Sequence, residues 1–135
     1  MDTHLTIIAQ TCLEGAESNA MTFPQIVGRL MQAGFESYAI DFRRESATYY
    51  LPNGDSVLLP THHGRMPIAA ALNVTAVQAA IGEAQRLAPG YTYAGFCTKV
   101  MAAGCAGYIV SFSGRRALYF GRTAETHVEH FPKPE

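Results

Sequence analysis

The chain contains one pattern twice, at an offset of seventy residues, and this repetition constrains the fold more than any other feature of the sequence. The segment TFPQIVGRLMQAGFESYAIDF (22–42) is matched by TYAGFCTKVMAAGCAGYIVSF (92–112). Positions that are identical in the two copies include Thr22/Thr92, Met31/Met101, Ala33/Ala103, Gly34/Gly104, Tyr38/Tyr108, Phe42/Phe112 and Tyr49/Tyr119. Most intervening substitutions keep chemical type, so each copy predicts the same supersecondary unit.

Each copy begins with a predicted helix. Thr22 is a natural N-cap with Gln25 in the capping-box position, and Gly34 is suited to the left-handed residue that ends a helix. After the glycine, apolar residues alternate with smaller or polar ones, which indicates a half-buried strand. An Asn53-Gly54 pair then predicts a hairpin turn between two further strands.

A second amphipathic helix precedes each copy, over residues 2–16 and 73–88. The predicted fold class is therefore α+β, with a helix-helix-strand-strand-strand unit that is internally duplicated. A half of about 65 residues would bury little core alone. We expect a single domain over residues 1–135, made of two repeats (approximately 1–66 and 67–135) that pack with pseudo-two-fold symmetry into an antiparallel sheet covered by helices. Matched positions such as Met31 and Met101, or Val27 and Cys97, should then have matched surroundings.

Charge and composition exclude several classes of protein. The formal net charge is −1, so the molecule has no general basic field for nucleic acid or anionic lipid. No apolar run approaches the length of a membrane span, and the N-terminal residues lack the features of a signal peptide. We therefore expect a cytoplasmic protein with no membrane partner. Three cysteines without a CxxC pair argue against disulfides and a zinc site, and no nucleotide-binding loop is present, so we expect neither a metal nor a cofactor.

The second half is similar to a known family in several short stretches. These are YAGFC at the start of a helix, IV in the next strand, YF in the strand after it, and VEHFP near the end. The sequence resembles a bacterial and prophage family of unknown function whose members are sometimes labelled phage envelope protein. The resemblance covers nearly the whole chain, but its motifs belong to the scaffold. It implies a prophage association and no activity, cofactor or catalytic residue.

Cys97 is the most tempting nucleophile. Its counterpart in the first copy is Val27, in the middle of an apolar helical stripe, and Cys105 aligns with Phe35. Free cysteine at such positions usually acts as a small buried hydrophobe, whereas a reactive thiolate needs positive charge and access. The comparison between copies therefore favours a structural role.

The junction between the copies, PTHHGR, offers a second candidate site. His62, His63 and Arg65 lie where the internal symmetry is broken, and histidines with an arginine could serve a small hydrolase-like or metal-assisted enzyme. Strand alternation separates His130 from His127 and Glu129, which weakens a metal site there. Adjacent histidines likewise point apart in an extended segment, and solvated histidines are the simpler interpretation.

A third candidate combines arginines with aromatic residues. Arg115, Arg116 and Tyr119 could bind single-stranded nucleic acid by phosphate contacts and base stacking. The near-zero net charge argues against nucleic acid as a partner and favours an ordinary solvated hairpin.

The leading hypothesis is a non-catalytic binding or interaction module. It would use the exposed sheet or the cleft between the halves to bind a small ligand or a protein partner. A homodimer is a further hypothesis for its oligomeric state. The candidate ligand-binding residues are His62, His63 and Arg65 at the junction and the matched pair Tyr38 and Tyr108. The enzyme at the His62/His63/Arg65 junction and the nucleic-acid module remain the alternatives.

Overall fold

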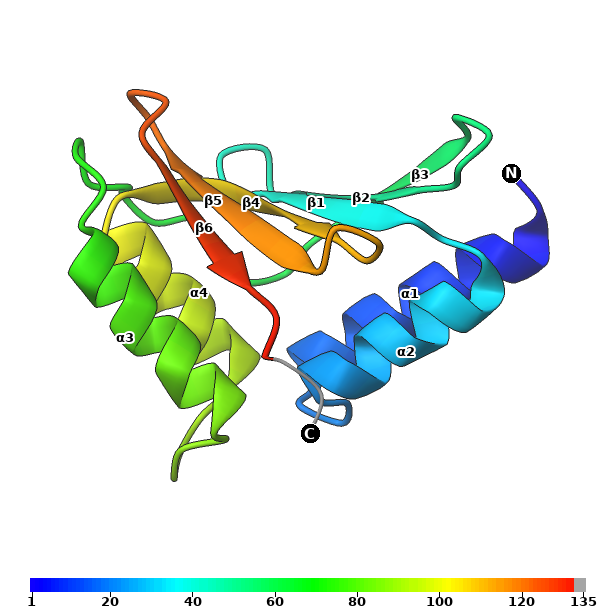
Figure 1. The fold of residues 1–135 in the computed structure, drawn as a ribbon, viewed down its shortest axis with the longest axis horizontal. Helices are drawn as coiled ribbons and strands as arrows, with labels where there is room; N and C mark the ends of the chain where they lie inside the picture. Colours follow the sequence, from blue (N-terminus) through cyan, green and yellow to red (C-terminus); the bar gives the residue numbers. More distant parts are fainter. Residues whose placement is uncertain (133–135) are drawn as a thin grey trace.

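The computed structural model describes residues 1–132, in which two helix pairs lie on one face of a six-stranded sheet (Figure 1). In chain order the elements are α1 (Thr3–Glu17), α2 (Phe23–Ala33), β1 (Ser37–Asp41), β2 (Ser46–Tyr50), β3 (Ser56–Pro60), α3 (Val74–Gln85), α4 (Tyr93–Ala102), β4 (Cys105–Ser111), β5 (Arg116–Gly121) and β6 (Thr126–His130). This order confirms the predicted α+β class and the helix-helix-strand-strand-strand unit. All strand pairs are antiparallel.

The six strands form one sheet in the order β3-β2-β1-β4-β5-β6, so the two halves meet through β1 and β4. Ala39 pairs with Ile109 at the middle of this contact. The strand pairing on either side repeats at the offset of seventy residues: Tyr38 pairs with Tyr49 in the first half, and Tyr108 pairs with Tyr119 in the second. The halves are thus related by a pseudo-two-fold axis near the Ala39–Ile109 pair.

The predicted ends of the α2 helix are confirmed in detail. The Thr22 side chain accepts a hydrogen bond from the Gln25 backbone N–H, and the Gln25 side chain accepts one from the Thr22 N–H. Gly34 ends the helix with φ of 101°, a left-handed conformation that glycine adopts without strain. The first hairpin of each half also turns in the same way, with positive φ at the matched positions Glu45 and Arg115.

One continuous cluster of buried apolar side chains runs through both halves beneath the sheet. Val27 and Cys97 are both buried in it, as the sequence comparison predicts. The three cysteines are free and buried. Within residues 1–132, none of the helices combines the length and apolar character needed to cross a membrane.

The expectation of matched surroundings is wrong for Met31 and Met101. The Met31 side chain is 52% exposed, whereas Met101 is 1% exposed. The reason is the junction between the halves, which packs against the end of α4: Ala69 donates a backbone hydrogen bond to the Met101 carbonyl, and Asn73 donates one to Ala103. The internal comparison is therefore valid for the sheet and for the Val27–Cys97 pair, but not where this junction contributes.

Candidate ligand-binding cavity

A cavity of about 460 Å³ lies beneath the sheet, between the two helix pairs. Its lining comes from all four helices, from β1, β2, β4, β5 and β6, and from the segment after β6. Six of the seven tyrosines of the chain contribute to it, and the seventh, Tyr50, lies on the opposite face of the sheet. The volume falls within the range of about 300–1,000 Å³ that is typical of small-molecule sites.

Four of these tyrosines form an array across the roof of the cavity, and we call Tyr49, Tyr38, Tyr108 and Tyr119 the tyrosine array. Tyr38 stacks on Tyr49 with ring centroids 5.5 Å apart, and Tyr108 stacks on Tyr119 at 5.2 Å. The two stacked pairs meet at the pseudo-two-fold axis, where Tyr38 and Tyr108 are arranged edge-to-face at 6.4 Å. The array follows from the strand register, because directly paired inward residues have neighbouring side chains.

The two halves differ in how they satisfy the tyrosine hydroxyls. The hydroxyl of Tyr108 lies 2.7 Å from that of Tyr93 on α4. The residue seventy positions before Tyr93 is Phe23, which has no hydroxyl, and Tyr38 has no hydrogen-bond partner among the described residues. Tyr38 is only 6% exposed and lines the cavity. The Tyr38 hydroxyl is not enclosed by protein atoms, so it is a group that a ligand can satisfy.

The tyrosines are neutral hydrogen-bond donors at physiological pH. Burial raises the pKa of Tyr38, Tyr93 and Tyr108 well above its usual range, since an ionised phenolate would be poorly solvated in this environment. Burial also raises the pKa of Tyr49 and Tyr119. The cavity therefore presents aromatic faces and hydroxyl groups, and no phenolate.

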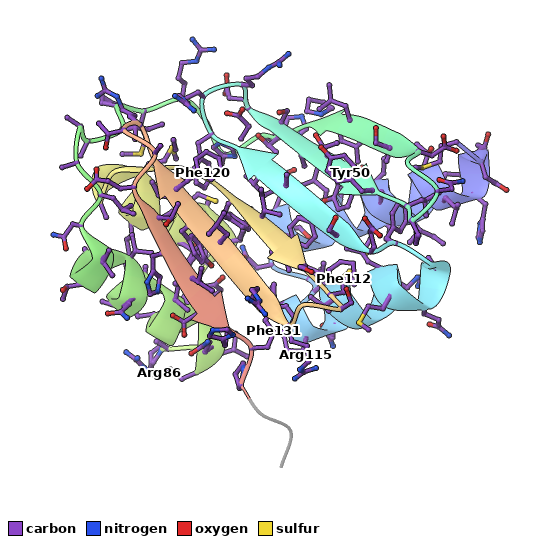
Figure 2. All side chains as sticks on the ribbon, turned by 45° about the horizontal axis from the view of Figure 1, so that its top comes forward. Tyr50, Arg86, Phe112, Arg115, Phe120 and Phe131 are labelled. Atoms are coloured by element: carbon purple, nitrogen blue, oxygen red, sulfur yellow. The ribbon has the colours of Figure 1, made fainter. Side chains whose placement is uncertain are left out.

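The remaining polar side chains of the lining include Asn19, Gln85, Glu129 and His130. Phe131 and Pro132 line the cavity after β6, and Phe131 packs edge-to-face on Phe23 of α2 at 5.6 Å. Figure 2 shows Arg115 beside Phe131, with its guanidinium 5.8 Å from the ring centroid. The Phe131–Phe23 contact joins the end of the second half to the helix pair of the first half, at one side of the cavity.

The candidate ligand residues from the sequence fall into two separate places. Tyr38 and Tyr108 line the cavity together, whereas His62, His63 and Arg65 do not line it. A second, smaller depression of about 220 Å³ lies on the opposite face of the sheet. Its lining does not contain His62, His63 or Arg65 either.

Each junction residue has its own contact. His62 is 73% exposed, and its Nδ1 lies 3.1 Å from Glu17 Oε1. The ring of His63 packs edge-to-face on Phe42 at 5.2 Å, and both of its nitrogens are buried without a partner among residues 1–132.

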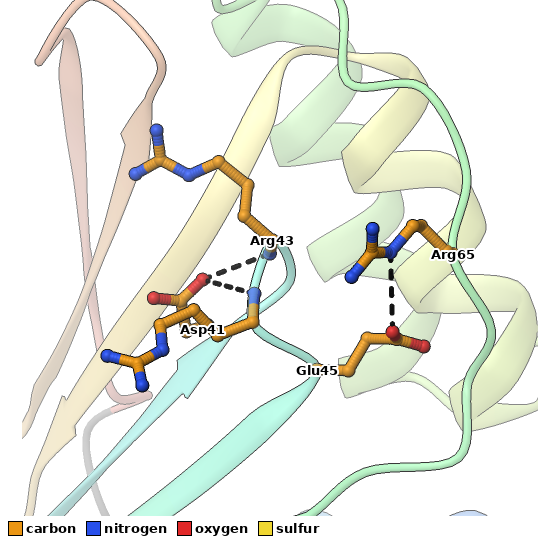
Figure 3. A network of polar contacts seen from close by, with 5 residues as sticks. Asp41, Arg43, Glu45 and Arg65 are labelled. Atoms are coloured by element: carbon orange, nitrogen blue, oxygen red, sulfur yellow. Dashed lines mark hydrogen bonds and ion pairs between the residues drawn. The ribbon is translucent and has the colours of Figure 1, made fainter.

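Arg65 belongs to a small polar network at the first hairpin (Figure 3). Its Nε lies 3.4 Å from Glu45 Oε2, and both residues are near the surface. Asp41 accepts hydrogen bonds from the backbone N–H groups of Arg43 and Arg44. The Asp41 carboxylate thus stabilises the turn, and Glu45 is the ion-pair partner of Arg65.

The residues of the nucleic-acid hypothesis do not share a surface. Tyr119 faces the cavity, while Arg116 alternates with it along β5 and is exposed. Arg115 donates a hydrogen bond to the Pro132 carbonyl at 3.3 Å. Base stacking on Tyr119 and phosphate contacts to Arg116 would have to occur on opposite faces of the sheet.

The thiol of Cys97 is inaccessible. The residue is completely buried, and burial raises its pKa to about 12. Cys105 is also buried, with its pKa raised to about 11. Thiols that stay protonated at neutral pH lack the nucleophilic form, in agreement with a structural role. Among residues 1–132, no group of three metal-ligating side chains (His, Cys, Asp or Glu) lies together.

Sequence reasoning missed most of the cavity. Tyr49, Tyr91, Tyr93 and Glu129 were not among its candidate ligand residues, and Tyr119 was assigned to nucleic acid. A signal was nevertheless present, because the inward strand positions carry tyrosine where phenylalanine would fill an apolar core without a hydroxyl to satisfy.

A family model described as "Protein of unknown function (DUF1398)" matches residues 12–129, which is most of the chain. Among curated proteins, none matches significantly.

Proposed function

We propose that this chain, which belongs to the DUF1398 family of proteins of unknown function, is a non-catalytic module that binds a small molecule in the central cavity. The observation that supports this most directly is the convergence of six of the seven tyrosines on one cavity of about 460 Å³. A core built only for stability would be filled to close packing, and it would use hydroxyl-free side chains.

The free hydroxyl of Tyr38 supports the same proposal. Its counterpart, Tyr108, is satisfied by Tyr93, so the pseudo-symmetry is broken at a position that lines the cavity. A ligand that accepts a hydrogen bond from Tyr38 would complete the arrangement in the first half. The apolar body of the ligand would pack on the rings of the tyrosine array.

Binding of N-phenyl-1-naphthylamine, an uncharged fluorescent aromatic probe, tests this proposal. We expect saturable fluorescence enhancement with the wild-type chain, and strong loss in Ala84→Phe, which places a ring in the cavity from α3. The matched control is Ala79→Phe, on the exposed side of the same helix, which should bind normally. Equal binding by both variants, or no saturable binding by the wild type, would contradict the proposal.

Several finer expectations remain proposals beside this one. The shared strand register supports an origin of the two halves by duplication.

Cytoplasmic location, a prophage association, a protein partner and a homodimer stay predictions. Sedimentation velocity will test for the homodimer. The enzyme alternative predicts loss of activity in His62→Ala. The nucleic-acid alternative predicts affinity that falls steeply with salt and weakens when Arg115 and Arg116 are replaced by alanine.

A further inference from the structure

The charged groups around the central cavity are unevenly distributed. Among residues 1–132, its lining contains one carboxylate, Glu129, and no lysine or arginine. In that described part of the lining, the other titratable side chains are His130, the tyrosines and Cys12. In an apolar site a single carboxylate has a larger effect than it would in water, so the lining favours a cation over an anion.

Glu129 on β6 lines the same cavity as the tyrosine array. It pairs in the sheet with Ala117, and it occupies the inward face together with His127. Its Oε1 lies 3.1 Å from His127 Nε2, which is its hydrogen-bond partner among the described residues, and its Oε2 has none. The pKa of Tyr119 is raised mainly by burial and then by Cys105. The negative charge of Glu129 raises it further, as expected for a neighbouring carboxylate.

The tyrosine array adds a second attraction for positive charge. The faces of aromatic rings carry negative potential, and an ammonium group within about 6 Å of a ring centroid is attracted to them. The stacked pairs Tyr38–Tyr49 and Tyr108–Tyr119 present several such rings around one space. Arg115 does not compete for this space, because its guanidinium lies over Phe131 and the residue is outside the lining.

We infer that the ligand of the cavity is a hydrophobic organic cation, an aromatic or alkyl ammonium compound. Its apolar body lies against the tyrosine array, and its ammonium group lies beside the free carboxylate oxygen of Glu129. This inference rests on the proposed function, because it assigns the chemistry of the ligand that the same cavity binds.

Three probes of one shape and different charge test the inference: 2-naphthylmethylammonium, 2-naphthylmethanol and 2-naphthoate. Isothermal titration calorimetry on the wild-type chain should show the ammonium compound binding about ten-fold more tightly than the alcohol, with the carboxylate weakest. In Glu129→Gln the preference for the ammonium compound over the alcohol should disappear, while the variant still binds the alcohol. Glu14→Gln removes a carboxylate from the exposed side of α1 and should leave the preference intact.

The outcomes separate the two proposals. If the alcohol and the ammonium compound bind equally and Glu129→Gln changes neither, the charge assignment is wrong while the cavity remains a binding site. If none of the three probes binds, or if Ala84→Phe binds them as the wild type does, the proposed function itself fails. Retained binding of the alcohol by Glu129→Gln also shows that this variant is folded.

Discussion

The hydroxyl oxygens of Tyr93 and Tyr108 lie 2.7 Å apart, and the corresponding pair in the first half, Phe23 and Tyr38, has only one hydroxyl. Phe23 contacts Phe131 instead and is partly exposed. The second half thus has an internally satisfied pair of hydroxyls. In the first half Tyr38 has no such partner, although the backbone of the two halves follows the same register.

Loss of the hydrogen bond between these two hydroxyls should destabilise the protein modestly. We expect Tyr93→Phe to lower the free energy of unfolding by about 1 kcal/mol, because Tyr108 loses its partner in a buried environment. The measurement is urea unfolding followed by circular dichroism. Tyr50→Phe, on the opposite face of the sheet, is the matched control and should change stability by less than about 0.5 kcal/mol. An equal loss in both variants would mean that the Tyr93–Tyr108 contact contributes nothing specific.

Stability should fall steeply in alkaline solution. Burial raises the pKa of Cys97 to about 12 and that of Cys105 to about 11, from an ordinary thiol value of 9.0, and it raises the pKa of the cavity tyrosines as well. Above pH 9 the unfolded chain loses these protons while the folded chain retains them, so unfolding becomes more favourable as pH rises. The urea midpoint should be flat from neutral pH to about pH 8.5 and should decrease through about pH 10.5.

A double substitution checks the origin of this alkaline effect. Cys97→Ala with Cys105→Ala removes two of the buried acids and should reduce the slope of stability against pH above pH 9. Part of the slope should remain in this variant, because the buried tyrosines still titrate on unfolding. A wild-type midpoint that does not change between neutral and strongly alkaline pH would contradict the burial of these groups.

His63 should make the protein sensitive to mild acid. Burial is the main cause that lowers the pKa of His63 below 6.5, and it outweighs the opposite effect of Glu45 and Glu17. As pH falls below 6.5, the unfolded chain takes up a proton that the folded chain resists, so stability present above pH 6.5 is lost. Urea midpoints across this range measure the effect.

The substitution His63→Phe separates this effect from general acid unfolding. Phenylalanine retains an aromatic contact with Phe42 and removes two buried nitrogens that have no partner among the described residues. We expect unchanged or higher stability at neutral pH and a weaker loss in mild acid. The exposed His4, changed to Gln, should leave the profile as in the wild type. A profile for His63→Phe that follows the wild type would assign the acid sensitivity to other groups.

Local patterns in the sequence were enough to predict the elements of the fold. The capping box at Thr22, the glycine at position 34 and the alternation after it are properties of adjacent residues, and they specify a helix, its end and a strand. The offset of seventy residues then predicted that the second half repeats the first. The exact offset also appears in the strand pairing, where Ala47–Leu59 corresponds to Ala117–Glu129.

The cavity and the junction depend on contacts between distant residues, which local patterns do not contain. Tyr49 and Tyr119 join the array only because the register places them opposite Tyr38 and Tyr108. Tyr93 reaches Tyr108 from a helix. Likewise, the junction bonds to the end of α4 through Ala69 and Met101, and Met101 is buried whereas Met31, its equivalent in the sequence, is exposed.

The matched glycines Gly34 and Gly104 provide the sharpest test of the junction. Both have positive φ, 101° and 94°, so alanine at either position is strained by about 1–2 kcal/mol. A Cβ at Gly34 would meet open space, whereas a Cβ at Gly104 would clash with the carbonyl of Ala71 in the junction. We therefore expect Gly34→Ala to cost about 1 kcal/mol, and Gly104→Ala to cost a further amount on the order of 2 kcal/mol as the junction is displaced.

Urea unfolding of the two glycine variants gives the comparison, and hydrogen exchange locates the cause. In Gly104→Ala the amides of Ala69 and Asn73, which bond to Met101 and Ala103, should exchange faster than in Gly34→Ala. Because the backbone strain is common to both variants, the difference between them isolates the packing of the junction on α4. Equal destabilisation, with unchanged protection at Ala69 and Asn73, would show that this packing does not account for the burial of Met101.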